Sequence, residues 1–142
     1  MDLTETLTLI QTILSGVGIV VSIAIFILGI KIANNSKYKE EYGLFYEIFK
    51  QKSEKLNSFK FINYNAFIKK LKSLKKMTLD EISRSLSECI TEECLLIFLE
   101  IAKEARCITW NGNREAESEV EIIDYKKIVR LAKKLYENIN TR

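Results

Sequence analysis

The sequence contains no histidine, the side chain that most often serves as a general base or a metal ligand near neutral pH. It also lacks the phosphate-binding patterns G-x-x-x-x-G-K and G-x-G-x-x-G and the nucleophile elbow G-x-S-x-G. The usual signatures of nucleotide binding and of acyl transfer are therefore missing. We expect a protein that is not an enzyme, with no catalytic residue.

Cysteine is scarce as well, with only Cys89, Cys94 and Cys107 in the chain. They form no C-x-x-C pair, and an odd number of cysteines without histidine argues against both a zinc site and a disulfide framework. We expect structural thiols, no metal site and no cofactor.

Charge is absent from one long stretch, residues 6–30, which are 25 consecutive uncharged residues. A helix of that length would be roughly 37 Å long, enough to cross a hydrocarbon core of about 30 Å. The stretch has no basic segment before it and is too long for a signal peptide. The sequence predicts a short extracytoplasmic N-terminus over residues 1–5 and a transmembrane helix over residues 6–33.

The flanks of this stretch differ in charge. Lys31, Lys37 and Lys39 follow it, whereas the residues before it carry only acids. The positive-inside rule then places the N-terminus outside and the C-terminal part in the cytoplasm of a single-pass cell-membrane protein, integral in the lipid.

Small and polar residues recur on one face of the predicted span. In lipid, helices associate where small side chains allow close approach and where hydroxyl or amide groups bond across the contact. We expect this face to pack against another transmembrane helix, in a homo-oligomer or with a different chain. The predicted packing face consists of Gln11, Ser15, Gly18, Ser22, Gly29 and Ala33.

Charge is unevenly distributed over the rest of the chain. Residues 31–76 contain 12 basic and 4 acidic residues, residues 77–125 contain 4 and 12, and residues 126–142 contain 6 and 1. We expect a basic, aromatic juxtamembrane helix over residues 34–61. A group of lysines farther along could contact anionic lipid, nucleic acid or the acidic middle of the same protein: Lys69, Lys70, Lys72, Lys75 and Lys76.

Helical periodicity and capping signals predict a small helical domain over residues 62–142. Thr78-Leu-Asp-Glu81 is a capping box and Thr91 a second N-cap, which predicts helices near 79–90 and 92–107. A third helix is expected over 124–139. Residues 107–123 fit a β-hairpin around the Asn111-Gly112 turn or the start of a long final helix. The expected fold class is all-α, with at most one short hairpin.

The order of segments in this domain is a helix, then "MTLDEISRSLS", a short turn, "ITEECLLIFLEIAKEARCI" and "TWNGN". This order resembles a winged-helix domain over about residues 62–123. The resemblance implies a helix-turn-helix followed by a hairpin wing, in a family that commonly binds DNA through its third helix and often binds proteins instead. Glu92 and Glu93 would repel phosphates, so we expect a protein partner and not nucleic acid.

These observations predict a non-enzymatic membrane anchor, adaptor or complex subunit that binds a cytoplasmic protein partner with its helical domain. Leu96 and Ile97 are the expected contact residues, because they flank the polar face of a largely apolar helix. Two alternatives stay open. One is an oligomerising membrane-active effector of the defence or toxin type that permeabilises the bilayer. The other is a membrane-tethered nucleic-acid-binding protein that uses the lysine group.

Overall fold

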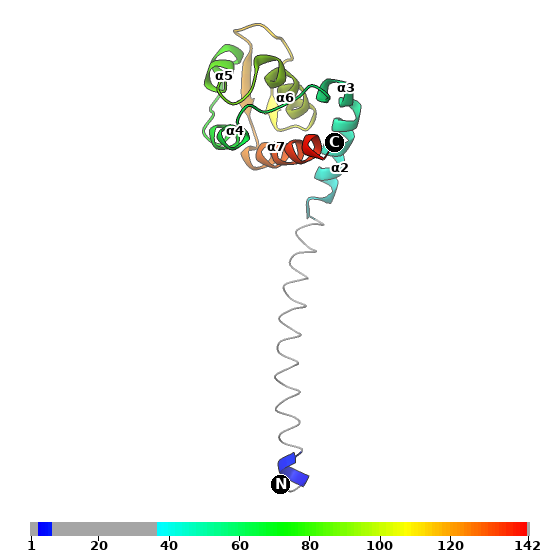
Figure 1. The fold of residues 1–142 in the computed structure, drawn as a ribbon. Helices are drawn as coiled ribbons and strands as arrows, with labels where there is room; N and C mark the ends of the chain where they lie inside the picture. Colours follow the sequence, from blue (N-terminus) through cyan, green and yellow to red (C-terminus); the bar gives the residue numbers. More distant parts are fainter. Residues whose placement is uncertain (1–2, 7–36, 142) are drawn as a thin grey trace. The chain divides into compact units, whose positions relative to one another are not determined.

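The computed structural model of the protein describes residues 3–6 and 37–141 (Figure 1). The chain divides into two compact units, Met1–Glu40 and Glu41–Arg142. The second unit contains the hydrophobic core, whose buried side chains run from Phe45 to Leu135. Residues 45–59 contribute five aromatic and aliphatic side chains to that core: Phe45, Ile48, Phe49, Leu56 and Phe59.

The membrane architecture expected from the sequence is corrected by the structure. A helix that crosses a bilayer needs about 20 predominantly apolar residues. The helices in the described part of the chain all fall short of the length and apolarity needed to cross a membrane. The single-pass architecture, the cell-membrane localisation and the cytoplasmic placement of the C-terminal part are therefore withdrawn.

The segment on which that expectation rested lies almost entirely outside the described residues, as Thr6 is its one described member. The same holds for the whole predicted packing face, which comprises Gln11, Ser15, Gly18, Ser22, Gly29 and Ala33.

Helices make up most of the second unit, and a small sheet joins them. In chain order the elements are α2 (Lys39–Gln51), α3 (Ser53–Leu56), α4 (Tyr64–Leu71), β1 (Met77–Thr78), α5 (Leu79–Ser85), α6 (Glu92–Glu104), β2 (Ile108–Thr109), β3 (Glu119–Ile122) and α7 (Tyr125–Asn140).

The three strands form one antiparallel sheet in the order β1-β3-β2. Met77 pairs with Val120, and Ile108 pairs with Ile122. The expectation of an all-α fold is therefore wrong, and residues 108–122 form a hairpin instead of the start of a long helix. From α4 to β3 the elements follow in the order helix, strand, helix, helix, strand, strand, and β1 is not among the elements that the sequence predicts.

The N-caps form where the sequence places them. The Thr78 hydroxyl accepts a hydrogen bond from the Glu81 amide at 3.2 Å, and the Thr91 hydroxyl accepts one from the Cys94 amide at 3.3 Å. These bonds satisfy amides that the first turn of a helix leaves without partners. Helix α5 nevertheless ends at Ser85, five residues before the predicted end.

The early end of α5 has a tertiary cause. The chain turns after Ser85, and the Cys89 carbonyl accepts hydrogen bonds from the Ile62 amide at 2.8 Å and the Asn63 amide at 3.1 Å. Asn63 is the N-cap of α4. The turn therefore joins the end of α5 to the start of α4, a contact that helical periodicity does not predict.

Helix α6 is the most deeply buried helix of the unit. Seven of its thirteen residues are buried, and Phe98 is fully inaccessible. The Phe98 ring meets the edge of the Phe67 ring of α4, with 5.1 Å between centroids. Helix α7 covers the same core with Ile128, Leu131 and Leu135, as its spacing predicts. In Figure 1, α7 lies at the opposite end of the unit from the loop that joins β2 to β3.

We predict that Phe98→Ala lowers the free energy of unfolding by about 3–5 kcal/mol, because it leaves a cavity between α4 and α6. Ile62→Ala is the matched control, since the Ile62 side chain is 57% exposed. It should cost about 0.5 kcal/mol. Urea denaturation followed by circular dichroism measures both values, and equal losses in the two variants would contradict this view of the core.

Candidate functional site

One narrow strip of α6 reaches the surface while the rest of the helix faces the core. The strip, called here the α6 strip, holds Leu96, four carboxylates and one lysine: Glu92, Glu93, Leu96, Glu100, Lys103 and Glu104. Leu96 is half-buried, whereas its neighbour Ile97 is only 9% exposed. Of the two predicted contact residues, Leu96 is therefore the more exposed to a partner.

Both residues line a hollow of about 230 Å³, called here the α6 hollow. Its floor is apolar and its rim is polar and charged. The rim side chains are Lys55 of α3, Ser58 just after α3, Glu93 at the start of α6 and Arg114 of the hairpin loop. The hollow is lined by Lys55, Ser58, Glu93, Leu96, Ile97 and Arg114.

Glu100 ties the walls of the hollow together. Its carboxylate accepts a hydrogen bond from Lys55 Nζ at 3.1 Å and another from the guanidinium of Arg114. One turn farther along α6, the Glu104 carboxylate lies 3.2 Å from Lys52 Nζ. A carboxylate at the middle of the α6 strip therefore holds both α3 and the hairpin loop against the helix.

These contacts set the charge state of Glu100. Partial burial acts to raise the pKa of this carboxyl, but hydrogen bonds from Lys55 and Arg114, together with the charges of the same two residues, hold the pKa below its usual value. The carboxylate is consequently charged over the whole physiological range, and the ion pairs remain intact there.

No motif or spacing in the sequence indicates this group of ion pairs. Lys55 and Glu100 are 45 residues apart, and Glu100 and Arg114 are 14 apart. Neither separation fits a helical spacing, so periodicity cannot connect these residues. Arg114 would be read as an ordinary loop charge, and Glu100 as part of a solvated helix face. A signal was present only in the acidic excess of residues 77–125 against the basic excess of residues 31–76.

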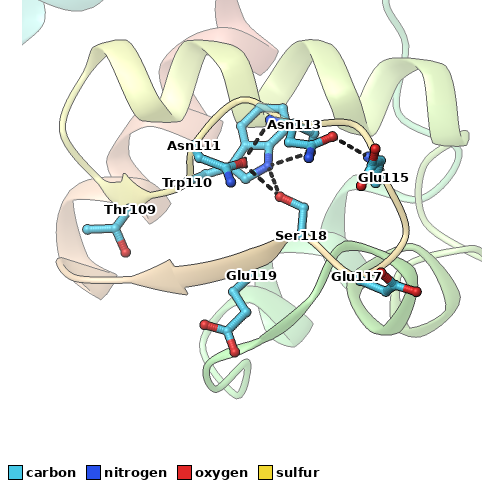
Figure 2. Close-up of a pocket in the computed structure, with 8 residues that line it drawn as sticks. All are labelled: Thr109, Trp110, Asn111, Asn113, Glu115, Glu117, Ser118 and Glu119. Carbon is cyan, nitrogen blue, oxygen red and sulfur yellow. Dashed lines mark hydrogen bonds between the residues drawn. The ribbon is translucent and has the colours of Figure 1, made fainter.

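The hairpin loop that carries Arg114 is held by a compact set of hydrogen bonds (Figure 2). The buried Trp110 indole N–H donates to Ser118 Oγ at 3.0 Å and to the Asn113 carbonyl at 3.1 Å. Asn111 Oδ1 in turn accepts from Ser118 Oγ at 3.0 Å and from the Asn113 amide at 2.8 Å. Gly112 takes the left-handed conformation, with φ of 79°, that the turn requires.

A shallow groove of about 470 Å³ runs beside this loop. The side chains of Asn111, Asn113 and Ser118 already bond to one another or to the loop backbone, and Figure 2 shows Glu117 and Glu119 pointing away from the Trp110 ring. Because these polar groups are engaged in shaping the loop, we interpret the groove as the structural support of Arg114.

The predicted lysine group is divided by the structure. Lys70 Nζ donates to the Ser85 carbonyl at 3.2 Å, and Lys76 pairs with Glu119 at 3.5 Å. The other three side chains are exposed: Lys69, Lys72 and Lys75. All five belong to α4 or the loop after it, so none of them lines the α6 hollow.

The three cysteines are free thiols, and all are buried. Burial raises the pKa of the Cys107 thiol to about 12, so that this thiol stays protonated near neutral pH. Within residues 3–6 and 37–141, no group of three or more acidic, cysteine or histidine side chains has an arrangement that could hold a metal ion.

No protein-family model, no curated protein and no solved structure matches the chain. The α6 hollow is therefore interpreted from its own residues.

We predict that Glu100→Gln removes part of the acid sensitivity of folding. Because the pKa of Glu100 is lowered in the folded state, its ion pairs stabilise the protein above the unfolded pKa of about 4.5, and this contribution is lost as the pH falls towards the folded pKa. At pH 7 the variant should be about 1 kcal/mol less stable than the wild type.

The difference between wild type and variant should shrink between pH 5 and pH 3 in urea denaturation series. Glu54→Gln is the matched control on α3, because the Glu54 side chain makes none of the contacts with α6. A constant difference across this pH range would show that Glu100 does not stabilise the protein through its charge.

Proposed function

We propose that this chain is a non-enzymatic adaptor or complex subunit that binds a segment of a protein partner in the α6 hollow. The observation that carries the proposal is the half-buried Leu96 at the floor of a hollow whose walls come from three separate elements. An apolar centre surrounded by a polar rim is the usual arrangement of protein–protein contact sites.

The size of the hollow supports a protein partner. Pockets for small molecules and cofactors usually measure about 300–1,000 Å³ and enclose most of the ligand. The α6 hollow is smaller, at about 230 Å³, and is open to solvent on one side. It is suited to one or two side chains of a larger partner, which would receive the rest of its contact area from the α6 strip.

The charge of the strip argues against nucleic acid at this site. In a winged-helix arrangement the helix equivalent to α6 would contact DNA. Here the strip carries four carboxylates and a single lysine. Bringing phosphates to this surface would bring together charges of the same sign, so the strip is unsuited to a phosphate backbone.

The rim also indicates the chemistry of the partner. Lys55 and Arg114 both pair with Glu100, whereas Glu92 and Glu93 are exposed and have no ion pair among the described residues. A complementary segment would place an apolar side chain in the hollow and a lysine or arginine next to Glu93.

The test is photocrosslinking of the full chain in the cells that produce it. A photoreactive amino acid at Leu96 should give a discrete, light-dependent adduct with a protein, and Glu93→Arg in the same chain should reduce its yield about tenfold or more. Leu44 is the matched control position, because it is also apolar and is 37% exposed on α2.

Equal adduct yields at Leu96 and Leu44, or no adduct at Leu96, would contradict the proposal. An adduct that persists in the Glu93→Arg chain would show that the acidic rim has no part in recognition.

A further inference from the structure

Helices α4 and α7 pack side by side and run in opposite directions. The Tyr64 and Tyr136 rings are stacked, with centroids 3.8 Å apart and planes 6° apart. At the other end of the pair, the Tyr125 hydroxyl donates to the Leu74 carbonyl. The start of α4 therefore lies beside the end of α7, and the end of α4 lies beside the start of α7.

The solvent-facing side of this pair is strongly basic. Together with the loop after α4, it carries five exposed lysines that make no ion pair within the described part of the chain. They are called here the basic surface: Lys69, Lys72, Lys75, Lys126 and Lys133. Lys126 and Lys133 are two turns apart on α7, about 10 Å along the helix axis. This spacing suits contact with an extended surface of another molecule better than binding of a small ligand in a pocket.

Several other charged groups of the two helices are already engaged. Arg130 donates to the two carboxylate oxygens of Glu41 at 2.6 and 2.7 Å, and Lys134 pairs with Glu137 at 3.3 Å. Asp124 caps α7 by accepting from the Lys127 amide at 3.0 Å. The positive charge of the five lysines is therefore not cancelled by acids of α4 or α7.

Surfaces of the opposite sign lie on the same chain, on different elements. Glu92 and Glu93 begin the α6 strip, and Glu115 and Glu117 lie on the hairpin loop, which is at the opposite end of the unit from α7 (Figure 1). The chain thus presents an acidic surface with an apolar hollow on one side and a basic surface on another.

The basic surface also has apolar side chains at its margin. Ile62, immediately before the N-cap of α4, is 57% exposed, and Tyr136 on α7 is 37% exposed. Lys133 and Tyr136 are three residues apart on α7, so one turn of this helix offers a lysine and an exposed aromatic ring, which suit the acidic rim and the apolar floor of the α6 hollow.

We infer that the partner of the α6 hollow is a second copy of this chain, which presents its basic surface, on α4, the loop after it and α7, to the acidic α6 strip. This inference rests on the proposed function. A contact between unlike surfaces can repeat head-to-tail in a ring or a filament, or it can be made twice across a twofold axis. The contact depends on unlike charges and weakens as salt rises.

The test uses the full chain in a mild non-ionic detergent, which keeps the uncharged stretch of residues 6–30 dispersed. Two variants reverse one surface each: Lys72→Glu/Lys126→Glu and Glu92→Lys/Glu93→Lys. Sedimentation equilibrium should show assemblies of the wild type at about 20 mM salt that dissociate by about 0.5 M. Each variant alone should associate about tenfold or more weakly.

A one-to-one mixture of the two variants tests whether the acidic α6 strip and the basic surface bind each other. Each variant retains the surface that the other has lost, so the mixture should regain salt-sensitive association to at least the mass of two chains. Association through the uncharged stretch would be the same in all samples and insensitive to salt. A wild-type mass that does not change with salt, or a mixture no heavier than its components, would overturn the inference.

The photoreactive Leu96 chain separates this inference from the proposed function. An adduct of twice the chain mass, lost in Lys72→Glu/Lys126→Glu, supports the second copy. An adduct with a different protein overturns the second copy and leaves the proposed function standing, and no adduct overturns both. Salt-sensitive binding of a labelled DNA or RNA duplex by an unassembled wild type would overturn the inference and assign the basic surface to nucleic acid.

Discussion

The burial of α6 on all sides but one is the constraint on which the structure depends. Leu95, Phe98 and Ile101 face the core, and Phe98 joins α6 to α4 through Phe67. A helix that is apolar nearly all round has to be enclosed, and here the α4–α7 pair, the sheet and α5 enclose it. Only the α6 strip is left at the surface. It is one residue wide at its centre, and Leu96 is its apolar side chain.

The charges around that strip follow from the same arrangement. Elements from the basic part of the chain are brought against an acidic helix, and Glu100 binds Lys55 of α3 and Arg114 of the hairpin. Isolated surface ion pairs contribute little stability. The two ion pairs of Glu100 nevertheless fix the positions of α3 and of the hairpin loop against α6. Ion pairs therefore hold the walls of the α6 hollow in place, while apolar side chains form its floor. The five lysines of the basic surface have no ion pair among the described residues, and this excess of positive charge suggests contact with another molecule.

Local patterns in the sequence were sufficient for the parts of the fold that depend on local physics. The caps at Thr78 and Thr91 and the buried stripe of α7 are set by residues within a few positions of one another. The short strand β1, the early end of α5 and the Glu100 ion pairs depend on contacts between distant segments. The periodicity of the sequence therefore does not predict them. The hairpin was ambiguous because its charged loop also fits a helix start. Leu96 could be chosen from the sequence as a flanking apolar position, but the hollow around it could not.

The central claim is that Leu96 belongs to a binding surface and not to the core, and one comparison tests it most directly. Leu96→Asp should lower the free energy of unfolding by about 1 kcal/mol, whereas Leu95→Ala, at a neighbouring position that is 1% exposed, should lower it by about 2–5 kcal/mol. In the same samples, salt-sensitive assembly measured by sedimentation equilibrium should be lost in Leu96→Asp. A large loss of stability in Leu96→Asp, or assembly equal to that of the wild type, would contradict the account.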